Sequence, residues 1–559
     1  MTAATQSISQ PPTLWRRLYG FGSIFGKAMR DSRRAMIVTG ALLAIIFLGV
    51  SKALVAEFDT PESRIELENL TRSIPPILAG LGGKITDNIA TMGGYLQYKY
   101  GTFIPLILSL WSILALSGTL ASEAQRGSLD ILAATGKSRQ RIALEKLGGH
   151  IVPLSIALTV LFLSIVVAGS AYPVLPGDEI SVTSAFAYTL WAGLMALAAG
   201  SLAFALGPFL GRGSAAGIAG FVTFAGFILN GYQAPVPALA PFASLTWWGW
   251  TSNHLALAGY YDWPSVALVA ALVAVLLYVG VSAFVRRDIG VTSVLPTPSM
   301  PRALRGLGGP VGRAVAGNLG AAIAWGAGLG LFGLILGNTS RDFLEQIQKS
   351  PMFLQLLQQA FPNNDYASAG GFLQLLFVQF GVLLAGLAAA TFVAGWSSDE
   401  TSGRLEMVLA TPLSRVRWAL AGGLGVLISI GVFVAIVVAG IAIGVGSSGQ
   451  DMTTPVTGSL ILAVYAAALG GIGLAVGGLV RTSWAAPAVV IVLLLTWLLQ
   501  LLGPLFDLPE VVQNLALTAH LGQTMVGVWD WGGVAAAAVL ALGGIALGAW
   551  GLQRRDLVR

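Results

Sequence analysis

Long apolar runs recur along the whole chain, and they limit its fold more than any other feature. About 20 apolar residues in a helix cross the roughly 30 Å hydrocarbon core of a bilayer. Six such runs lie in the first half, at 35–56, 101–122, 150–172, 184–208, 214–232 and 264–285. Six more lie in the second half, at 319–337, 372–396, 419–446, 458–480, 484–503 and 533–552. The runs predict an all-α membrane protein with twelve transmembrane helices.

The scarcity of charge agrees with this prediction. Charged residues make up 10% of the chain, whereas a soluble domain contains about 25%. The composition therefore excludes a soluble enzyme, a disordered chain and, despite an isoelectric point near 9.5, a nucleic-acid-binding protein. Because the chain has no cysteine, thiolate zinc sites, disulfides and iron–sulfur clusters are excluded as well.

The distribution of charge predicts the orientation in the membrane. An even number of spans places both termini on one side. The segments on that side hold 24 Lys and Arg against 9 Asp and Glu, whereas the segments on the other side hold 6 against 16. Basic residues collect on the cytoplasmic side of membrane proteins. Both termini are therefore expected to be cytoplasmic.

Residues 1–34 form a polar tail followed by a basic amphipathic stretch. Its apolar residues recur at helical spacing and are accompanied by Arg and Lys: Leu14, Leu18, Phe21, Phe25 and Met29. This pattern predicts an interfacial helix on the inner leaflet, although a helix that binds a calmodulin-like partner has a similar pattern. The first apolar run begins at Ala35 and is too long for a cleaved signal peptide.

Two cytoplasmic segments form an internal repeat. SEAQRGSLDILAATGKSRQR at 122–141 follows the second span, and SDETSGRLEMVLATPLSRVR at 398–417 follows the eighth. At an offset of 276 residues they share eight of twenty identities without gaps. Since repeats mark repeated structural units, we expect the two halves of the chain to have similar folds.

Two further pairs of segments follow in the same order. LGRGSAA at 210–216 resembles LVRTSWA at 479–485, and RRDI at 286–289 resembles RRDL at 554–557. Since six spans return the chain to its starting side, the halves 35–285 and 319–559 are expected to form a parallel repeat. Residues 286–318 join them, either as a plain linker or with a second interfacial helix formed by apolar Leu304, Leu307, Val311 and Val315 and basic Arg302, Arg305 and Arg313.

The chain shows no energy source of its own. Ion-coupled carriers place ionisable residues inside their spans, and the predicted spans are almost free of them. The string ATGKS at 134–138 resembles the end of a phosphate-binding loop, but Ile131 stands where that loop requires glycine. His254 and His520 lie in predicted external segments, where hydrogen bonding is the more common role. The sequence therefore predicts a protein without catalytic or metal sites.

Each repeated cytoplasmic segment contains a glycine and then a short apolar helix that cannot bury its own face. Ser138 and Ser414 are suited to cap the next helix. One such segment in each half fits a two-fold symmetric cytoplasmic partner. An ordinary charged loop is the alternative reading, but the duplication favours docking.

These features together resemble the permease subunits of type-2 ABC exporters. The resemblance rests on the basic amphipathic stretch before the first span, on six spans in each half and on the repeated segment. In that family the segment has an acidic residue, then Gly-(Ser/Thr)-Leu-(Asp/Glu), a short apolar stretch and Thr-(Pro/Gly)-x-Ser-Arg. The residues that match are Glu123, Gly127, Leu129, Asp130, Thr135, Gly136, Ser138 and Arg139 in the first copy, and Asp399, Gly403, Leu405, Glu406, Thr411, Pro412, Ser414 and Arg415 in the second.

The resemblance implies a coupling helix in each half, seated on one of two cytoplasmic ABC ATPase subunits. Those subunits would bind Mg-ATP, and this chain would bind no cofactor. The fused twelve-span form resembles the actinobacterial exporters of polyketide antibiotics of the tetronasin type. It implies export of apolar small molecules across a bacterial cytoplasmic membrane. The second copy has Ser402 and Arg404 where the first has Arg126 and Ser128, so the two docking sites are expected to differ.

A substrate cavity among the spans should have few polar groups within apolar walls. Five residues are candidates for it, and each could instead bond a neighbouring helix: Asn230, Gln374, Gln379, Trp497 and Gln500. The Trp-containing segments 232–263 and 503–532 are expected to form external re-entrant helices over the cavity. The acidic segments 57–100 and 338–371 are expected to form helical external extensions.

Two other classes of protein compete with an ABC exporter. A secondary carrier or channel without an ATPase would require an ion-coupling residue buried among the spans. A membrane-embedded enzyme acting on lipid or polymer would require clustered Asp and His near one interface.

Overall fold

A computed structural model describes residues 23–74, 83–119, 137–286, 308–349, 354–355, 357–358, 365–401, 403–502 and 509–555. The chain forms two compact units. Unit 1 comprises residues 1–71, 82–219 and 244–293, and unit 2 comprises residues 72–81, 220–243 and 294–559. Residues 120–136, which hold most of the first copy of the repeat, and most of the linker 286–318 lie outside the described residues.

Ten of the described helices are long and apolar enough to cross a membrane. They are α2 (Ile24–Glu57), α9 (Arg139–Ala171), α10 (Val182–Tyr232), α13 (Trp263–Arg286), α14 (Pro310–Gln348), α16 (Ala369–Thr401), α18 (Arg415–Ser447), α20 (Ile461–Leu479, with the preceding α19, Thr453–Gly458), α21 (Ala485–Leu502, with η4, Thr482–Trp484) and α23 (Trp531–Arg554). The pair α5 (Met92–Tyr100) and α6 (Phe103–Thr119), bent by 42°, brings the number to eleven if it is one span. The protein is therefore an all-α, multi-pass membrane protein.

The helix α10 contains two of the predicted spans, 184–208 and 214–232. Gly211 interrupts it with φ 75° and ψ 172°, a backbone conformation that favours glycine. Pro208, one turn earlier, also removes a helical hydrogen bond. The sequence predicted two separate spans here, and the structure has two helices that meet at a kink at Gly211.

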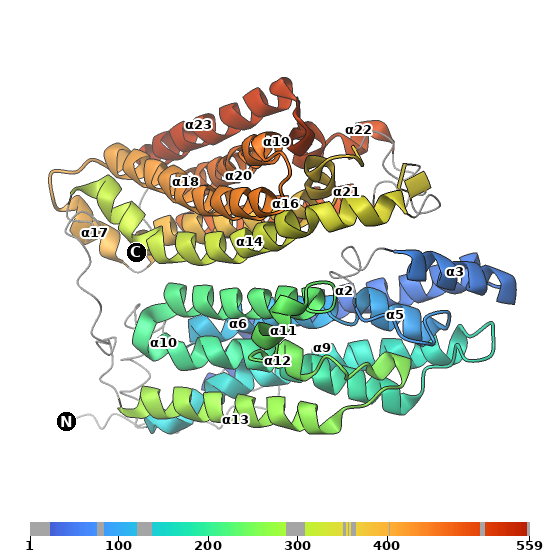
Figure 1. The fold of residues 1–559 in the computed structure, drawn as a ribbon. Helices are drawn as coiled ribbons and strands as arrows, with labels where there is room; N and C mark the ends of the chain where they lie inside the picture. Colours follow the sequence, from blue (N-terminus) through green and yellow to red (C-terminus); the bar gives the residue numbers. More distant parts are fainter. Residues whose placement is uncertain are drawn as a thin grey trace, which may run out of the picture. The chain divides into compact units, whose positions relative to one another are not determined.

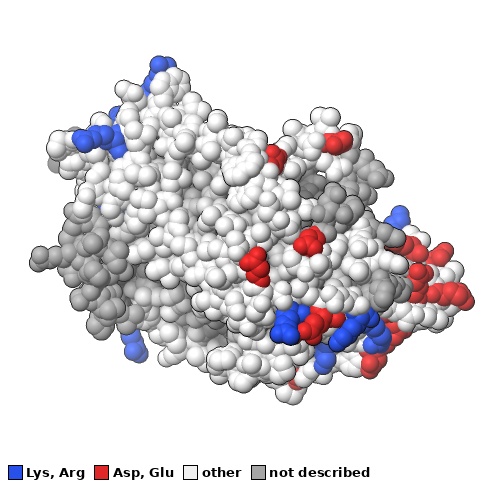
Figure 2. All heavy atoms as spheres, turned by 45° about the horizontal axis from the view of Figure 1, so that its top comes forward, with Lys and Arg blue, Asp and Glu red and all other residues white. Residues whose placement is uncertain are grey.

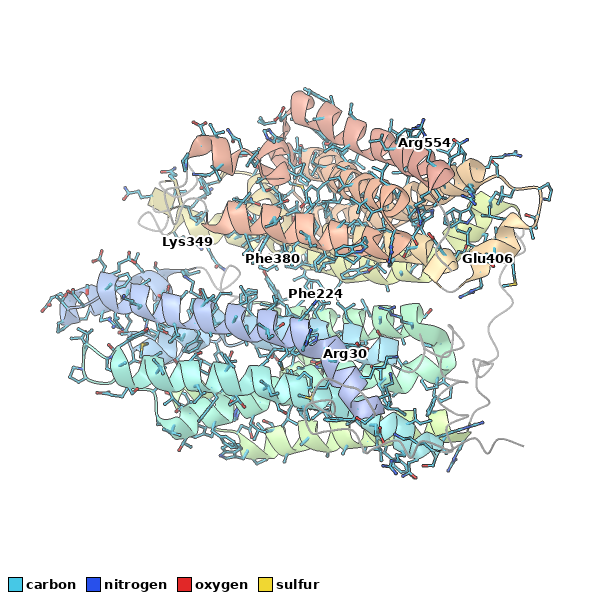
Figure 3. All side chains as sticks on the ribbon, turned by 180° about the vertical axis from the view of Figure 1, so that it is seen from behind. Arg30, Phe224, Lys349, Phe380, Glu406 and Arg554 are labelled. Carbon is cyan, nitrogen blue, oxygen red and sulfur yellow. The ribbon has the colours of Figure 1, made fainter. Side chains whose placement is uncertain are left out.

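In unit 1, α2 packs along α9. Small residues allow the helices to approach: a side chain at Gly149 would meet the Cβ of Ala28 at 2.3 Å, and one at Gly40 would meet Ala157 at 3.5 Å. Close approach at small residues is typical of helices in lipid. Figure 3 shows α2 changing direction near Arg30, although the helix is continuous from Ile24.

In unit 2, α14 packs along α18 and α20 packs along α23 (Figure 1). A Cβ at Gly440 would lie 2.2 Å from the carbonyl oxygen of Gly330, and one at Gly478 would lie 2.1 Å from that of Gly548. These distances leave no room for any side chain. Large apolar residues fill the interior beside them, including the stacked pair Phe343 and Phe372 with ring centres 4.3 Å apart.

Shorter elements connect the long helices. In unit 1, α3 (Pro61–Ser73) and α5 confirm the expected helices within 57–100. The segments 232–263 and 509–532 contain only one-turn helices and a two-stranded hairpin, so re-entrant helices do not form in their described residues. The elements are η1 (Pro237–Leu239), α11 (Ala240–Ala243), α12 (Trp247–Trp250), η2 (Ala256–Ala258), α22 (Glu510–Gln513), η5 (Leu517–His520), β1 (Gly522–Gln523), η6 (Thr524–Val526) and β2 (Val528–Trp529).

Most of the visible surface is uncharged (Figure 2). The acidic side chains in that view gather mainly at one end, where Figure 1 places α3. Large apolar residues are exposed on the long helices, among them Ile45, Leu163 and Leu542. A broad apolar surface of this kind fits contact with lipid.

The same turn occurs twice, 268 residues apart. In unit 1, η2 ends at Gly259 with φ 86°, and in unit 2, η6 ends at Gly527 with φ 85°. Leu255 pairs with Tyr260 in the first turn, and Gln523 pairs with Val528 in the second. Each turn leads through an aspartate and a tryptophan into a long helix, α13 or α23.

Candidate functional site

The described copy of the repeated segment is a short helix between two long ones. After α16, Gly403 adopts φ 72° and the six-residue helix α17 (Arg404–Leu409) follows. Glycine is favoured at Gly403 because other residues are strained in this left-handed conformation. The backbone N–H of Gly403 donates to the carbonyl oxygen of Glu400 at 3.0 Å. Figure 3 shows Glu406 of α17 at the same end of unit 2 as Arg554, away from Lys349.

The two faces of α17 differ. Leu405 is buried within unit 2, whereas the side chain of Met407 is 67% exposed. Arg404 and Glu406 are also exposed. Leu405 therefore anchors α17 to its own unit, and the outward face consists of Arg404, Glu406 and Met407. Of the predicted apolar face, Met407 is the residue most available to a partner.

The ends of the repeated segments form as the sequence predicts. Ser414 caps α18 by accepting the backbone N–H of Arg417 at 3.2 Å, and Ser138 caps α9 by accepting that of Arg141 at 3.3 Å. The hydroxyl group of Thr411 donates to the carbonyl oxygen of Val408 and so closes the end of α17. These bonds fix the entry of the chain into α9 and α18.

Asp399 connects the second segment to α14. Arg313, in the first turn of α14, donates to the Asp399 carboxylate at 2.9 Å. Arg313 belongs to the stretch predicted as a second interfacial helix, and Val311, Arg313 and Val315 form the beginning of α14. The remaining residues of that prediction, from Arg302 to Leu307, lie outside the described residues.

In unit 1, hydrogen bonds join the start of α9 to α2. Glu145 of α9 receives hydrogen bonds from Lys137, from Arg141 and from the backbone N–H of Phe25 in α2. Burial raises the pKa of the Glu145 carboxyl group, but these hydrogen bonds outweigh it and lower the pKa below its usual value. Arg139 donates to the carbonyl oxygen of Val285. Glu123, Gly127, Leu129, Asp130 and Thr135 lie outside the described residues.

The five cavity candidates have different surroundings. The side-chain oxygen of Asn230 accepts a hydrogen bond from Gln233, and that of Gln374 accepts the backbone N–H of Met525. Gln379 and Gln500 are exposed, and Trp497 is half-buried. The Asn230 bond is thus local, within three residues of the chain, whereas the Gln374 bond reaches the η6 turn.

Polar groups that the sequence analysis passed over lie inside unit 1. His150 of α9 is buried, with its Nε2 3.0 Å from the hydroxyl oxygen of Ser112 and its ring edge-on to Trp111. Lys146, one turn earlier, is buried as well. They lie near the start of the predicted span 150–172, where the sequence suggests the membrane surface. Their burial was therefore not predicted.

A buried ion pair fastens α3 to the rest of unit 1. Arg64 donates to Asp178 at 2.9 Å, to the carbonyl oxygen of Phe58 and to that of Ala90. Asp178 also accepts the backbone N–H of Met92, which begins α5. The pair lies far apart in the sequence, and no local pattern indicates it.

Comparison with known proteins agrees with a transport role. Residues 307–553 match the family model for the C-terminal domain of the multidrug efflux system permease Rv1217c. The multidrug efflux system permease protein Rv1217c of Mycobacterium tuberculosis is 28% identical over 317 residues, which are 55% of this chain. The aligned part spans 56% of that relative's length. Both similarities are to the permease component of a multidrug efflux system.

Proposed function

We propose that this chain is the membrane-spanning subunit of an ATP-driven ABC exporter in a bacterial cytoplasmic membrane. Two cytoplasmic ATPase subunits, each binding Mg-ATP, would dock on the two repeated segments. The observation that carries the proposal is α17, a short helix with exposed Arg404, Glu406 and Met407 that joins α16 to α18. Both termini would then be cytoplasmic, as the distribution of basic residues favours.

Matching helix contacts support two parallel six-span halves. Gly149 approaches Ala28 in unit 1 as Gly425 approaches Ala314 in unit 2, at 2.3 and 2.4 Å for an added Cβ. With α5 and α6 as one bent span and α10 as two spans divided at Gly211, the halves would contain twelve spans. Each half would present one docking segment, as a two-fold symmetric pair of ATPases requires.

The transport step follows from this arrangement. Closure of the ATPases on ATP would displace the docking segments and change the relative positions of the helices that they join. A central cavity would open outward and release an apolar or amphipathic compound, of which polyketide antibiotics are one class. Gln379, Trp497 and Gln500 remain candidates for polar contacts to that compound. The similarity to a multidrug efflux permease supports export.

Purification tests the proposal. The tagged chain is isolated in mild detergent from membranes of its own host, and co-eluting proteins are identified and assayed for ATP hydrolysis. An ABC ATPase present at about two copies per chain, with vanadate-sensitive hydrolysis, is expected. A single chain without an ATPase, after cross-linking in the membrane, would contradict the proposal.

An ion-coupled carrier is the second candidate function. The observation in its favour is the buried pair of ionisable residues His150 and Lys146 on α9. The Nδ1 atom of His150 has no hydrogen-bond partner within the described part of the chain. Buried ionisable residues in membrane proteins often mark ion pathways. Transport driven by a proton gradient without ATP would support this candidate.

A further inference from the structure

Arg555, at the end of α23, connects four helix ends of unit 2. Its two terminal nitrogens donate to the two carboxylate oxygens of Glu400, near the end of α16. Its Nε donates to the carbonyl oxygen of Gly478, at the end of α20, at 3.0 Å. Its own carbonyl oxygen accepts from the Nη1 of Arg415, at the start of α18, at 2.9 Å.

The ion pair at the centre of this junction is buried. The Arg555 side chain is 12% exposed and that of Glu400 is 6% exposed. Two parallel charge-assisted bonds fix orientation as well as distance. Because both charges are removed from water, losing one partner leaves the other uncompensated.

These contacts lie on both sides of α17. Glu400 precedes α17 and accepts the backbone N–H of Gly403, the residue at the turn into the helix. Arg415 follows α17 as the first residue of α18. Arg555, the residue that follows α23, therefore contacts the segments on both sides of α17.

Trp396 reinforces the same region one turn before Glu400. Its ring lies against α18 and α20, because a Cβ at Gly422 or at Gly477 would come within 2.2 or 2.8 Å of it. It also stacks on Trp418, with ring centres 5.3 Å apart. The end of α16 is therefore held tightly against α18 and α20.

We propose that Arg555 is a positioning residue that transmits displacements of α17 to α20 and α23. The proposal rests on the proposed function, in which an ATPase displaces α17. At the position of Glu400 the first copy of the repeat has Ala124. The Glu400–Arg555 ion pair is therefore specific to the second half. Displacement of the two docking segments would be transmitted through different contacts.

Spin labels test this connection in the chain alone. Because the protein has no cysteine, cysteines introduced at Ala410, after α17, and at Leu547, on α23, can be labelled without background. Both positions are exposed. A reference pair at Ile323 on α14 and Leu495 on α21 reports on the rest of unit 2. Distances within each pair are measured by double electron–electron resonance in detergent.

Arg555→Gln is expected to broaden the 410–547 distance distribution and to leave the 323–495 distribution unchanged. Arg554→Gln is the matched control, since Arg554 is the adjacent arginine and lies over the Trp550 ring. Glu400→Gln/Arg555→Gln removes both charges together, so it separates loss of the connection from the effect of a lone buried charge. Unchanged 410–547 distances in the double variant, or equal broadening of the reference pair, would overturn the proposal.

A second measurement uses the complex with the co-purified ATPase. Arg555→Gln is expected to retain the ATPase but to lose about tenfold of the ethidium-stimulated hydrolysis, within the range for residues that share one network. If the ATPase no longer co-purifies with Arg555→Gln, Arg555 is needed for docking, and the proposal that it transmits displacement is overturned. If the unmodified chain brings down no ATPase, the proposed function fails, and the label distances alone decide whether Arg555 connects α17 to α23.

Discussion

The side-chain oxygen of Gln374 accepts the backbone N–H of Met525 at 3.1 Å, and Gln97 accepts that of Leu257 at the same distance. Gln97 and Gln374 occupy matching positions in GGYLQ and GGFLQ, 277 residues apart. In both sites a glycine near the glutamine leaves room for the turn. A Cβ at Gly93 would lie 2.3 Å from the carbonyl oxygen of Leu257, and one at Gly370 would lie 2.2 Å from that of Met525. The duplicated contact fastens one glycine-ended turn to α5 in unit 1 and the other to the first two turns of α16 in unit 2.

Gly370→Ala is expected to destabilise this contact. The added methyl group would overlap the Met525 carbonyl oxygen, and overpacking of this kind costs about 1–3 kcal/mol. Gly431→Ala is the matched control, because nothing lies within 4 Å of its Cβ position in α18. Unfolding midpoints in detergent should fall for Gly370→Ala alone. Equal midpoints for the two variants would contradict the close contact.

Asp178→Asn is expected to destabilise unit 1. The change leaves Arg64 buried beside a neutral group, and breaking a buried ion pair costs about 3–5 kcal/mol. Glu345→Gln removes a charge from the exposed pair with Arg341, which should contribute about 0.3–0.5 kcal/mol. Thermal unfolding compares the two variants. A similar, small effect of both would show that Arg64 does not depend on Asp178.

His254 should make stability depend on pH. Burial lowers the pKa of its imidazole below the ordinary value of 6.5, and its Nδ1 accepts the backbone N–H of Asp262. The unfolded chain therefore binds a proton at a higher pH than the folded chain, so stability falls as the pH drops below 6.5. His254→Gln should lose less stability than the unmodified protein between pH 7.5 and pH 5.5. An identical loss would contradict a buried, neutral His254.

Met407→Glu is expected to weaken docking without unfolding the chain. Met407 is the exposed apolar residue of α17, and placing a charge in the desolvated centre of an interface removes its apolar contact and buries an unpaired charge. Met452→Glu is the matched control, since Met452 is also exposed and lies beside α19. The measurement is the amount of ATPase that co-purifies with each variant. If the full amount of ATPase co-purifies with Met407→Glu, α17 is not part of the docking surface.

The sequence was sufficient for the features that depend on local patterns. Apolar runs predicted the long helices, and the serines before Arg139 and Arg415 predicted the caps of α9 and α18. A burial pattern cannot show which side of a short helix faces its own protein, so Leu405 was expected on the docking face. Its burial follows from packing within unit 2.

Contacts between segments that lie far apart in the chain could not be predicted from the sequence. The Gly-Gly-aromatic-Leu-Gln repeat was visible in it, but its role depends on turns that lie 160 and 151 residues further along. Glu400 and Arg555 are likewise separated by 155 residues.

Transport into inverted membrane vesicles tests the central claim most directly. Vesicles that contain the chain and its co-expressed ATPase are supplied with ATP and a fluorescent apolar dye, with either vanadate or a protonophore. The account predicts dye accumulation that requires ATP, stops with vanadate and continues with the protonophore. Accumulation that continues with vanadate and stops with the protonophore would contradict it and establish the chain as an ion-coupled carrier.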